Sequence, residues 1–304
     1  MTDNATTANK PQEFRGGEAG DTITSSASCG CLDADNLRGN GGNDTLVNAG
    51  PGLLNLFGDA GNDVERTTSA TGQTRLFGGT GVDRVDYSAA TTPVVAKIDT
   101  GAFDSGANGD DFLASDIEAI SGGSAGDALT GSSAANVLAG YGGADTLNGM
   151  DGDDFMAGGA PGDGSTRADV FSGGNGSDTV TFSFINRTEG VNVSLDGIQN
   201  DGGLLSGGGG TAPATGGANS SNVMPDVERV NGTNSGDTIS AASAPAGVTL
   251  VGNGGFDTLT GSNFNDFLDG GPDAANSLSC GGGTMDGYRI SSVPAKPADC
   301  EIGI

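Results

Sequence analysis

Histidine and tryptophan are absent from this sequence of 304 residues, and tyrosine occurs only 3 times. Without histidine, no imidazole is available as a general base near neutral pH. Lysine and arginine together number 12, too few and too dispersed to form the basic patch that binds nucleic acid or an anionic membrane. No apolar run approaches the roughly 18 residues of a transmembrane helix. We therefore expect neither nucleic-acid binding nor membrane insertion.

The same shortages argue against an enzyme. The lysines Lys10, Lys97 and Lys296 lie far apart, and no nucleophile stands in a recognisable arrangement with a base. Pairs of carboxylates are common, so the two-carboxylate geometry of a glycosidase stays open. Sugar-binding subsites usually stack sugars on aromatic rings, which are scarce here. We predict that the chain is not an enzyme, with a polysaccharide-active β-helix enzyme as the less favoured alternative.

Glycine and acidic residues are abundant instead, with 58 glycines and a formal net charge of −27. The stretch Gly122 to Ala157 divides into nine-residue units, GGSAGDALT, GSSAANVLA, GYGGADTLN and GMDGDDFMA. Each begins with glycine, carries Asp or Asn at its sixth position and has an apolar residue at its eighth. Glycine-rich positions one to five can turn sharply, because glycine reaches positive φ at little cost. Positions six to nine then form a short strand with side chains on alternating faces.

This pattern resembles the nonapeptide repeat G-G-x-G-x-D-x-U-x of RTX (hemolysin-type) calcium-binding proteins, in which U is a large apolar residue. The resemblance implies an all-β fold, a right-handed parallel β-roll or β-helix solenoid of stacked nonapeptide repeats with two lateral inserts. It also implies multiple Ca²⁺ ions as the cofactor, bound where position-six side chains stack at about 4.8 Å. The predicted metal ligands are Asp21, Asp44, Asp63, Asp83, Asp127, Asn136, Asp145, Asp154, Asp169, Asp178, Asp237, Asp257, Asp266 and Asp286.

The repeats are interrupted twice by similar segments. In both, an alternating strand (Val94, Ala96, Ile98; Val191, Val193, Leu195) precedes a loop and the motif Asp-Ile-Glu or Asp-Val-Glu. The predicted segments are a flexible leader (1–15), a repeat solenoid (16–86), an insert of a strand and a loop (87–121), a repeat solenoid (122–181), an insert of a strand and a low-complexity loop (182–231), a repeat solenoid (232–288) and a C-terminal cap (289–304).

Strict nine-residue units alternate with longer units in the first repeat segment. Since alternate units of a two-unit coil lie on opposite sides, Asp21, Asp44, Asp63 and Asp83 should form a ladder along one edge. In 122–157 both edges carry Asp or Asn in register, so we expect the most ordered ions there. Some units depart from the pattern. Glu65 stands where an apolar residue is expected, and glycine at position four is replaced by Ala19, Ala125, Ser235 or Phe264. These replacements predict sites of unequal affinity.

Four cysteines suit an oxidising compartment. We expect a disulfide between Cys280 and Cys300 that staples the last coil. Cys29 and Cys31 could pair with each other or remain free, and a metal site there is less favoured because no further Cys or His supports it.

The biochemical activity expected from the resemblance is multisite calcium binding coupled to folding. The N-terminal residues lack the apolar core of a secretory signal peptide, so either a signal has been removed or export uses another route. The resemblance implies the second, because RTX proteins often leave the cell without N-terminal cleavage. We expect an extracellular or cell-surface protein, first a structural, surface-layer or self-assembling protein. The alternative is a calcium-binding adhesin or carrier module, whose partner could be a cell-surface glycan.

Overall fold

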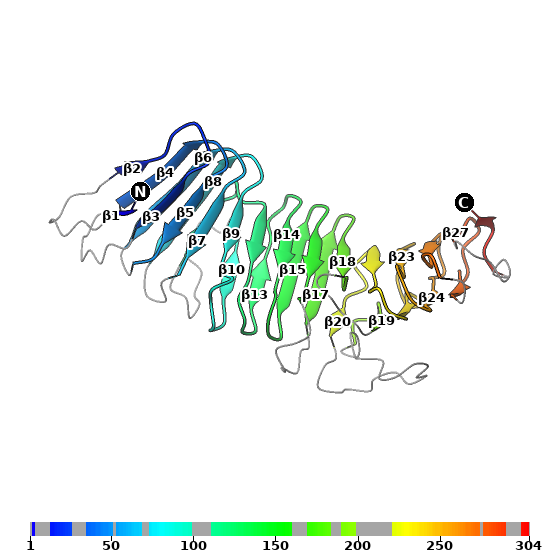
Figure 1. Cartoon of the computed structure of the whole chain (residues 1–304). Helices are drawn as coiled ribbons and strands as arrows, with labels where there is room; N and C mark the ends of the chain where they lie inside the picture. Colours follow the sequence, from blue (N-terminus) through cyan, green and yellow to red (C-terminus); the bar gives the residue numbers. More distant parts are fainter. Residues whose placement is uncertain are drawn as a thin grey trace. The chain divides into compact units, whose positions relative to one another are not determined.

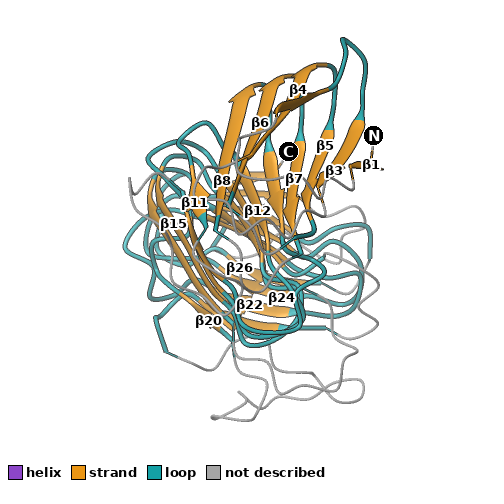
Figure 2. Cartoon of the chain, turned by 90° about the vertical axis from the view of Figure 1, so that its left-hand side faces the viewer, coloured by secondary structure: helices purple, strands orange, loops and turns teal. Residues whose placement is uncertain are grey.

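The computed structural model describes residues 2–3, 13–25, 35–50, 53–68, 73–98, 111–159, 169–183, 190–198, 221–273, 276–289 and 299–303. These residues form strands and loops and no helix (Figure 2). The described part of the chain accordingly has no helix that could cross a membrane. The predictions about Cys29, Cys31 and most of the low-complexity loop in the second insert (182–231) concern residues outside the described ranges.

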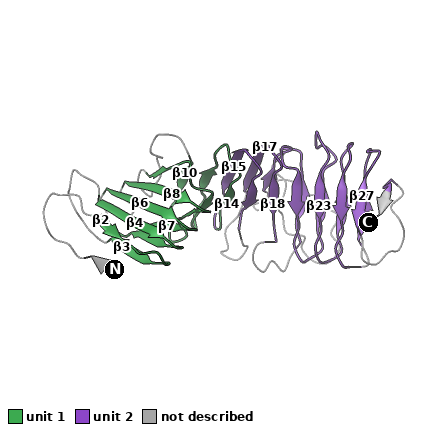
Figure 3. Cartoon of the chain, turned by 90° about the horizontal axis from the view of Figure 1, so that it is seen from above, with its two compact units in different colours: residues 1–141 green, residues 142–304 purple. Residues whose placement is uncertain are grey.

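The chain divides into two compact units, Met1–Tyr141 and Gly142–Ile304, coloured separately in Figure 3. Each unit is a stack of short parallel strands (Figure 1). The predicted all-β fold of stacked parallel strands is thereby confirmed.

Unit 1 contains two lines of strands on its two sides. The β3 sheet consists, in spatial order, of β1 (Thr2–Asp3), β3 (Thr22–Ser25), β5 (Thr45–Asn48), β7 (Val64–Thr67), β9 (Arg84–Asp86), β12 (Ala119–Ser121) and β14 (Val137–Ala139). The β4 sheet consists of β2 (Glu13–Arg15), β4 (Asp35–Gly41), β6 (Leu54–Ala60), β8 (Thr74–Thr80) and β11 (Phe112–Leu113). A further parallel pair joins β10 (Val95–Lys97) to β13 (Ala128–Thr130).

Unit 2 repeats this arrangement. The β18 sheet consists of β16 (Phe155–Ala157), β18 (Thr179–Thr181), β21 (Arg229–Asn231), β23 (Thr249–Val251), β25 (Phe267–Asp269), β27 (Gly287–Arg289) and β28 (Ile302–Gly303). The β17 sheet consists of β15 (Thr146–Asp151), β17 (Val170–Asn175) and β20 (Asn222–Val223). The β22 sheet consists of β19 (Asn192–Ser194), β22 (Thr238–Ser240), β24 (Thr258–Thr260) and β26 (Ser277–Ser279).

Consecutive repeat strands lie in different sheets, so one coil of the solenoid contains two repeats. In the β3 sheet, Leu46 of β5 pairs with Ile23 of β3 on one side and with Glu65 of β7 on the other. The position-eight side chains are buried, and Leu46 and Leu56 are 0% exposed. Positions seven and nine alternate with them and are half-buried in β4 and β6. The core of each unit is therefore a thin stack of apolar side chains between the sheets.

The strands of both inserts belong to these sheets. Val94, Ala96 and Ile98 are buried, and β10 pairs in parallel with β13. In the second insert, β19 pairs in parallel with β22. The sequence predicts lateral inserts, whereas these strands lie within the stack, because they carry the same alternation of buried apolar residues as the repeats.

Candidate metal centre

Position six of each repeat lies immediately before a strand, where the turn enters the sheet. In unit 1 the backbone N–H groups of three such residues donate to the position-six carboxylate of the next coil. The Asp21 N–H donates to Oδ1 of Asp44 at 2.7 Å, and the Asp44 N–H donates to Oδ1 of Asp63 at 2.7 Å. The Asp63 N–H donates to Oδ1 of Asp83 at 2.8 Å. These residues thus form the one-edge ladder that the alternation of unit lengths predicts.

The same bond recurs in unit 2. It joins Asp154 to Asp178 at 2.9 Å, Asp237 to Asp257 at 2.8 Å, and Asp266 to Asp286 at 2.9 Å. Asp145 donates in the same way to Asp169 at 3.0 Å. We call each position-six residue in such a ladder a rung. One carboxylate oxygen of each of these rungs therefore accepts a hydrogen bond that fixes the register between coils. The other oxygen is not used in this bond and is the one that could bind a ligand.

The second oxygen of many rungs is buried and accepts no hydrogen bond. This holds for Oδ2 of Asp44, Asp63, Asp83, Asp178, Asp257 and Asp286. A buried polar group without a partner costs about 1–3 kcal/mol, and more when it is charged. Several such oxygens on stacked coils create an unmet demand for positive charge.

Burial also perturbs the titration of these rungs. The pKa of Asp83 rises to about 6, chiefly because of burial, while the N–H donor of Asp63 opposes the rise and the carboxylates of Asp63, Glu118 and Asp116 add to it. Burial raises the pKa of Asp257 to about 7, with added repulsion from Asp237 and Asp273. The direction is the same at Asp44, Asp63, Asp178 and Asp286, where burial is again the largest cause.

Glycine at position one shapes the space beside each second oxygen. A Cβ on Gly39 would lie 2.1 Å from Oδ2 of Asp44 and 2.5 Å from the Gly58 carbonyl oxygen. A Cβ on Gly58 would lie 2.3 Å from Oδ2 of Asp63 and 2.4 Å from the Gly78 carbonyl oxygen. The missing side chain thus leaves a cradle lined by a carboxylate oxygen and a backbone carbonyl of the next coil.

These donors suit calcium. Ca²⁺ takes six to eight oxygen ligands from carboxylates and backbone carbonyls in flexible geometry. Within the described ranges, no group of three or more Asp, Glu, Cys or His side chains has the geometry of a metal cluster. An ion between rungs would therefore take much of its coordination from backbone carbonyls such as that of Gly58.

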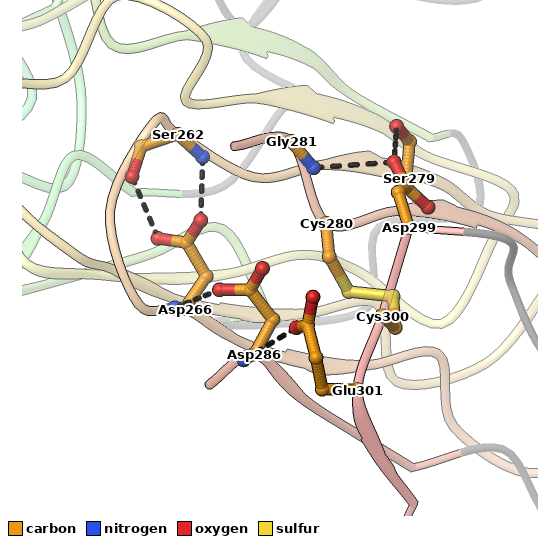
Figure 4. Close-up of a disulfide and its surroundings, with 9 residues drawn as sticks. All are labelled: Ser262, Asp266, Ser279, Cys280, Gly281, Asp286, Asp299, Cys300 and Glu301. Atoms are coloured by element: carbon orange, nitrogen blue, oxygen red, sulfur yellow. Dashed lines mark hydrogen bonds between the residues drawn. A yellow bond between two sulfur atoms is a disulfide. The ribbon is translucent and has the colours of Figure 1, made fainter. Parts of the chain in front are cut away.

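Three glutamates continue the ladders and were not among the predicted ligands. The Asp83 N–H donates to Oε2 of Glu118 at 2.7 Å, and the Asp178 N–H donates to Oε2 of Glu228 at 2.8 Å. At the C-terminal end, the Asp286 N–H donates to Oε2 of Glu301 at 2.9 Å (Figure 4). A search for Asp or Asn at position six misses them, although the spacing Glu-x-apolar would have found Glu118 and Glu228.

Each of these glutamates belongs to an Asp-x-Glu motif whose aspartate caps a glycine turn. Asp116 accepts the N–H groups of Gly78 and Gly79, at 3.2 and 3.0 Å. Asp226 accepts the N–H of Gly173 at 3.2 Å. Asp299 accepts the N–H of Gly281 at 3.2 Å, as Figure 4 shows. The motif therefore ends a run of repeats three times, the third time in the C-terminal cap.

The middle residue of the third motif is Cys300, which forms a disulfide with Cys280. The Cα atoms of the two residues are 5.2 Å apart, and both side chains are buried (Figure 4). In the other two motifs the corresponding residues, Ile117 and Val227, are buried apolar side chains. The disulfide thus replaces an apolar contact where the chain closes its last coil.

Glu65 is a buried acid that does not belong to the ladders. It occupies position eight of its repeat, is 0% exposed and has two carboxyl oxygens without a hydrogen-bond partner. Burial raises its pKa well above the ordinary value of 4.5, the neighbouring Asp83, Asp116 and Asp63 add to the rise, and the Gly58 N–H, too poorly placed for a hydrogen bond, opposes it with the smallest effect. The expected apolar residue is missing here, yet the coil geometry is kept.

Comparison with protein families supports this interpretation of the ladders. The model of the RTX calcium-binding nonapeptide repeat matches four copies, at residues 32–48, 121–160, 163–182 and 251–274. No match was found among curated proteins. Asp21, Asp63, Asp83, Asp237 and Asp286 lie outside the matched ranges, but each occupies a rung in the same ladders as the matched residues. The chain therefore carries RTX calcium-binding nonapeptide repeats, folded as parallel β-solenoid coils.

Proposed function

We propose that this protein binds several calcium ions along its ladders and that this binding drives its folding. The observation that carries the proposal is the set of buried second carboxylate oxygens without partners, as at Asp44, Asp63 and Asp178. A cation beside each of these oxygens would offset the cost of burying it, and the glycine at position one leaves space for such an ion. Ca²⁺, the ion that RTX repeats bind, would supply that positive charge and take these oxygens as ligands.

Electrostatics makes folding dependent on the ion. The chain carries a formal charge of −27, and its ladders bring carboxylates to successive coils. Without a cation, their mutual repulsion and desolvation oppose a core only one side chain thick. An ion that binds the folded state alone adds about 2.7 kcal/mol per site at 100 times its dissociation constant. Several such sites are comparable with the whole stability of a domain.

Calcium titration followed by far-ultraviolet circular dichroism tests this proposal. We expect β-structure to develop cooperatively with calcium, and equimolar magnesium to be a poor substitute, because Mg²⁺ prefers rigid octahedral sites and sheds water reluctantly. Full β-structure in excess chelator at neutral pH would sink the proposal.

We also propose an extracellular or cell-surface location and a structural, non-catalytic role. Repeats of moderate affinity can respond to extracellular calcium, so the chain would fold after export. The β18 sheet ends at β28, and the terminal strand of a solenoid offers an edge for pairing with a second copy. Calcium-dependent filaments or sheets in electron micrographs would support self-assembly. Saturable glycan binding by a monomeric chain would favour the adhesin alternative.

A further inference from the structure

The turns of the repeats are of two kinds. In the open turns, positions two and four both have positive φ. In the repeat of Asp44 these are Asn40 (φ 71°) and Gly42 (φ 106°). The corresponding pairs in the other open turns are Asp59 and Gly61, Gly79 and Gly81, Tyr141 and Gly143, Met150 and Gly152, Gly174 and Gly176, and Asn253 and Gly255. The rungs of these turns include Asp44, Asp63, Asp83, Asp178 and Asp257, whose Oδ2 atoms are buried without a partner.

In the closed turns, the position-two N–H donates to a side-chain oxygen of the rung in the same repeat. Gly17 donates to Asp21 at 2.6 Å, and Gly123 donates to Asp127 at 2.6 Å. The other closed turns join Ser132 to Asn136 at 2.6 Å, Thr233 to Asp237 at 2.7 Å and Ser262 to Asp266 at 2.7 Å (Figure 4 shows the last). A backbone donor therefore satisfies the oxygen that an open turn leaves unmet.

The residue at position four separates the two kinds. Open turns have glycine there, with φ between 106° and 155° for Gly42, Gly61, Gly81, Gly143, Gly152, Gly176 and Gly255. An L-residue rarely adopts such φ values. Closed turns have a residue with a side chain instead: Ala19, Ala125, Ala134, Ser235 or Phe264. Since these residues cannot follow the open path, the chain takes the path that directs the position-two N–H at the carboxylate.

Hydroxyl groups strengthen several closed turns. The Thr233 hydroxyl donates to Oδ1 of Asp237 at 2.9 Å, and the Ser262 hydroxyl donates to Oδ1 of Asp266 at 2.9 Å. The rung with a neutral side chain, Asn136, also lies in a closed turn, where the Ser132 hydroxyl lies 3.1 Å from its oxygen. A closed rung can therefore carry a neutral side chain. An open rung needs its negative charge to bind a cation.

We infer that the residue at position four sorts the rungs, so that calcium is taken up at open rungs and not at closed rungs. The inference rests on the proposed calcium binding. It assigns Asp21, Asp127, Asn136, Asp237 and Asp266 to an ion-independent class, against their prediction as ligands. Of the four units in 122–157, the first two are closed, so the most ordered ions are not spread over that whole stretch.

The repeat at the end of unit 2 belongs to neither class. In 281–289, Thr284 occupies position four, yet Oδ2 of Asp286 is buried without a partner. Positive φ falls instead on Gly281, at position one. This terminal turn lies beside the Asp299 cap, and we leave Asp286 out of the test.

Two variants with matched charge test the inference. In the open-rung variant, Asp44, Asp63, Asp178 and Asp257 are all changed to Asn. In the closed-rung variant, Asp21, Asp127, Asp237 and Asp266 are all changed to Asn. Each variant removes four carboxylates, two from each unit, and Asn keeps the oxygen that accepts the bond between coils.

Bound calcium per full-length chain is measured by equilibrium dialysis and atomic emission. We expect the open-rung variant to lose at least half of the bound ions and the closed-rung variant to lose none. Equal losses in the two variants would overturn the inference while leaving calcium binding intact. Absence of calcium from the unaltered chain would instead overturn the proposed function.

A gain-of-binding variant covers the case in which the open-rung variant fails to fold. Phe264→Gly combined with Ser262→Asn gives the repeat of Asp266 the open-turn residues at positions four and two, as in the repeat of Asp257. We expect one more bound ion than in the unaltered chain, or a severalfold gain in affinity at this end. An unchanged calcium count in a folded variant would refute the sorting rule.

Discussion

Replacement of Glu65 by leucine should stabilise unit 1 substantially. The side chain lies in the apolar stack between Leu46 and Val85, which pair with it on either side. It is 0% exposed, and neither carboxyl oxygen has a hydrogen-bond partner. Leucine has nearly the same length and belongs to the residue class that fills position eight elsewhere, so the coil should accept it without rearrangement.

The expected gain has two sources. Burying a leucine side chain stabilises a fold by about 1.5–3 kcal/mol. Removing a buried polar group without a partner relieves about 1–3 kcal/mol. Allowing for some overlap between these terms, we expect the free energy of unfolding of unit 1 to rise by about 3 kcal/mol. Glu65→Gln removes the charge but keeps unpartnered polar atoms, so it should recover only a small part of the gain.

Urea unfolding in saturating calcium, followed by circular dichroism at several pH values, measures this gain. Because the pKa of Glu65 is raised in the folded state, the free energy of unfolding of unit 1 is highest below pH 4.5, where Glu65 is protonated in both states. It falls as the pH rises above that value. The advantage of leucine should therefore grow from acid to neutral pH. A midpoint for Glu65→Leu equal to or below that of the unaltered chain at pH 7 would show that a partner satisfies this carboxylate.

Three further predictions follow from the ladders and the cap. Gly58→Ala places a Cβ 2.3 Å from Oδ2 of Asp63 and should lower both stability and calcium uptake, whereas Gly17→Ala, whose Cβ would lie 3.6 Å from the nearest carboxylate oxygen, should be tolerated in the same dialysis assay. Removing the disulfide by Cys280→Ser with Cys300→Ser opens a loop of sequence separation 20 and should lower the free energy of unfolding of unit 2 by about 3 kcal/mol. Urea unfolding in saturating calcium measures this loss, and equal midpoints with and without the disulfide would show that it does not stabilise the last coil. In excess chelator, β-structure measured by circular dichroism should be greater at pH 5 than at pH 8. The reason is that a pKa raised in the folded state, about 7 at Asp257, makes the free energy of unfolding fall as the pH rises through it. More β-structure at pH 8 than at pH 5 would contradict the raised pKa values of the rungs.

The sequence predicts the coil well because the repeat is a local pattern. Apolar position eight and glycine-rich turns place Leu46 and Leu56 in the core without knowledge of distant contacts. The alternation of long and short units likewise predicts that Asp44 and Asp63 share an edge. Both predictions need only the period of the repeat.

The parts that the sequence does not reveal depend on backbone geometry or distant pairing. Glu118 becomes a rung because β12 pairs with β9, across a loop that interrupts the repeat. The lack of a partner at Oδ2 of Asp63, in contrast to the satisfied oxygen of Asp21, depends on which way the position-two N–H points. The replacement of glycine by Ala19 signals a difference at that repeat, but only the φ values show that it closes the turn.

Anomalous scattering from crystals grown in millimolar calcium would test the central claim most directly. The account predicts calcium peaks beside the Oδ2 atoms of open rungs, such as Asp44 and Asp63 in unit 1 and Asp178 and Asp257 in unit 2. It predicts no peak at Asp21 or Asp266, whose second oxygens accept backbone N–H groups. A folded chain with no calcium at the open rungs would contradict it.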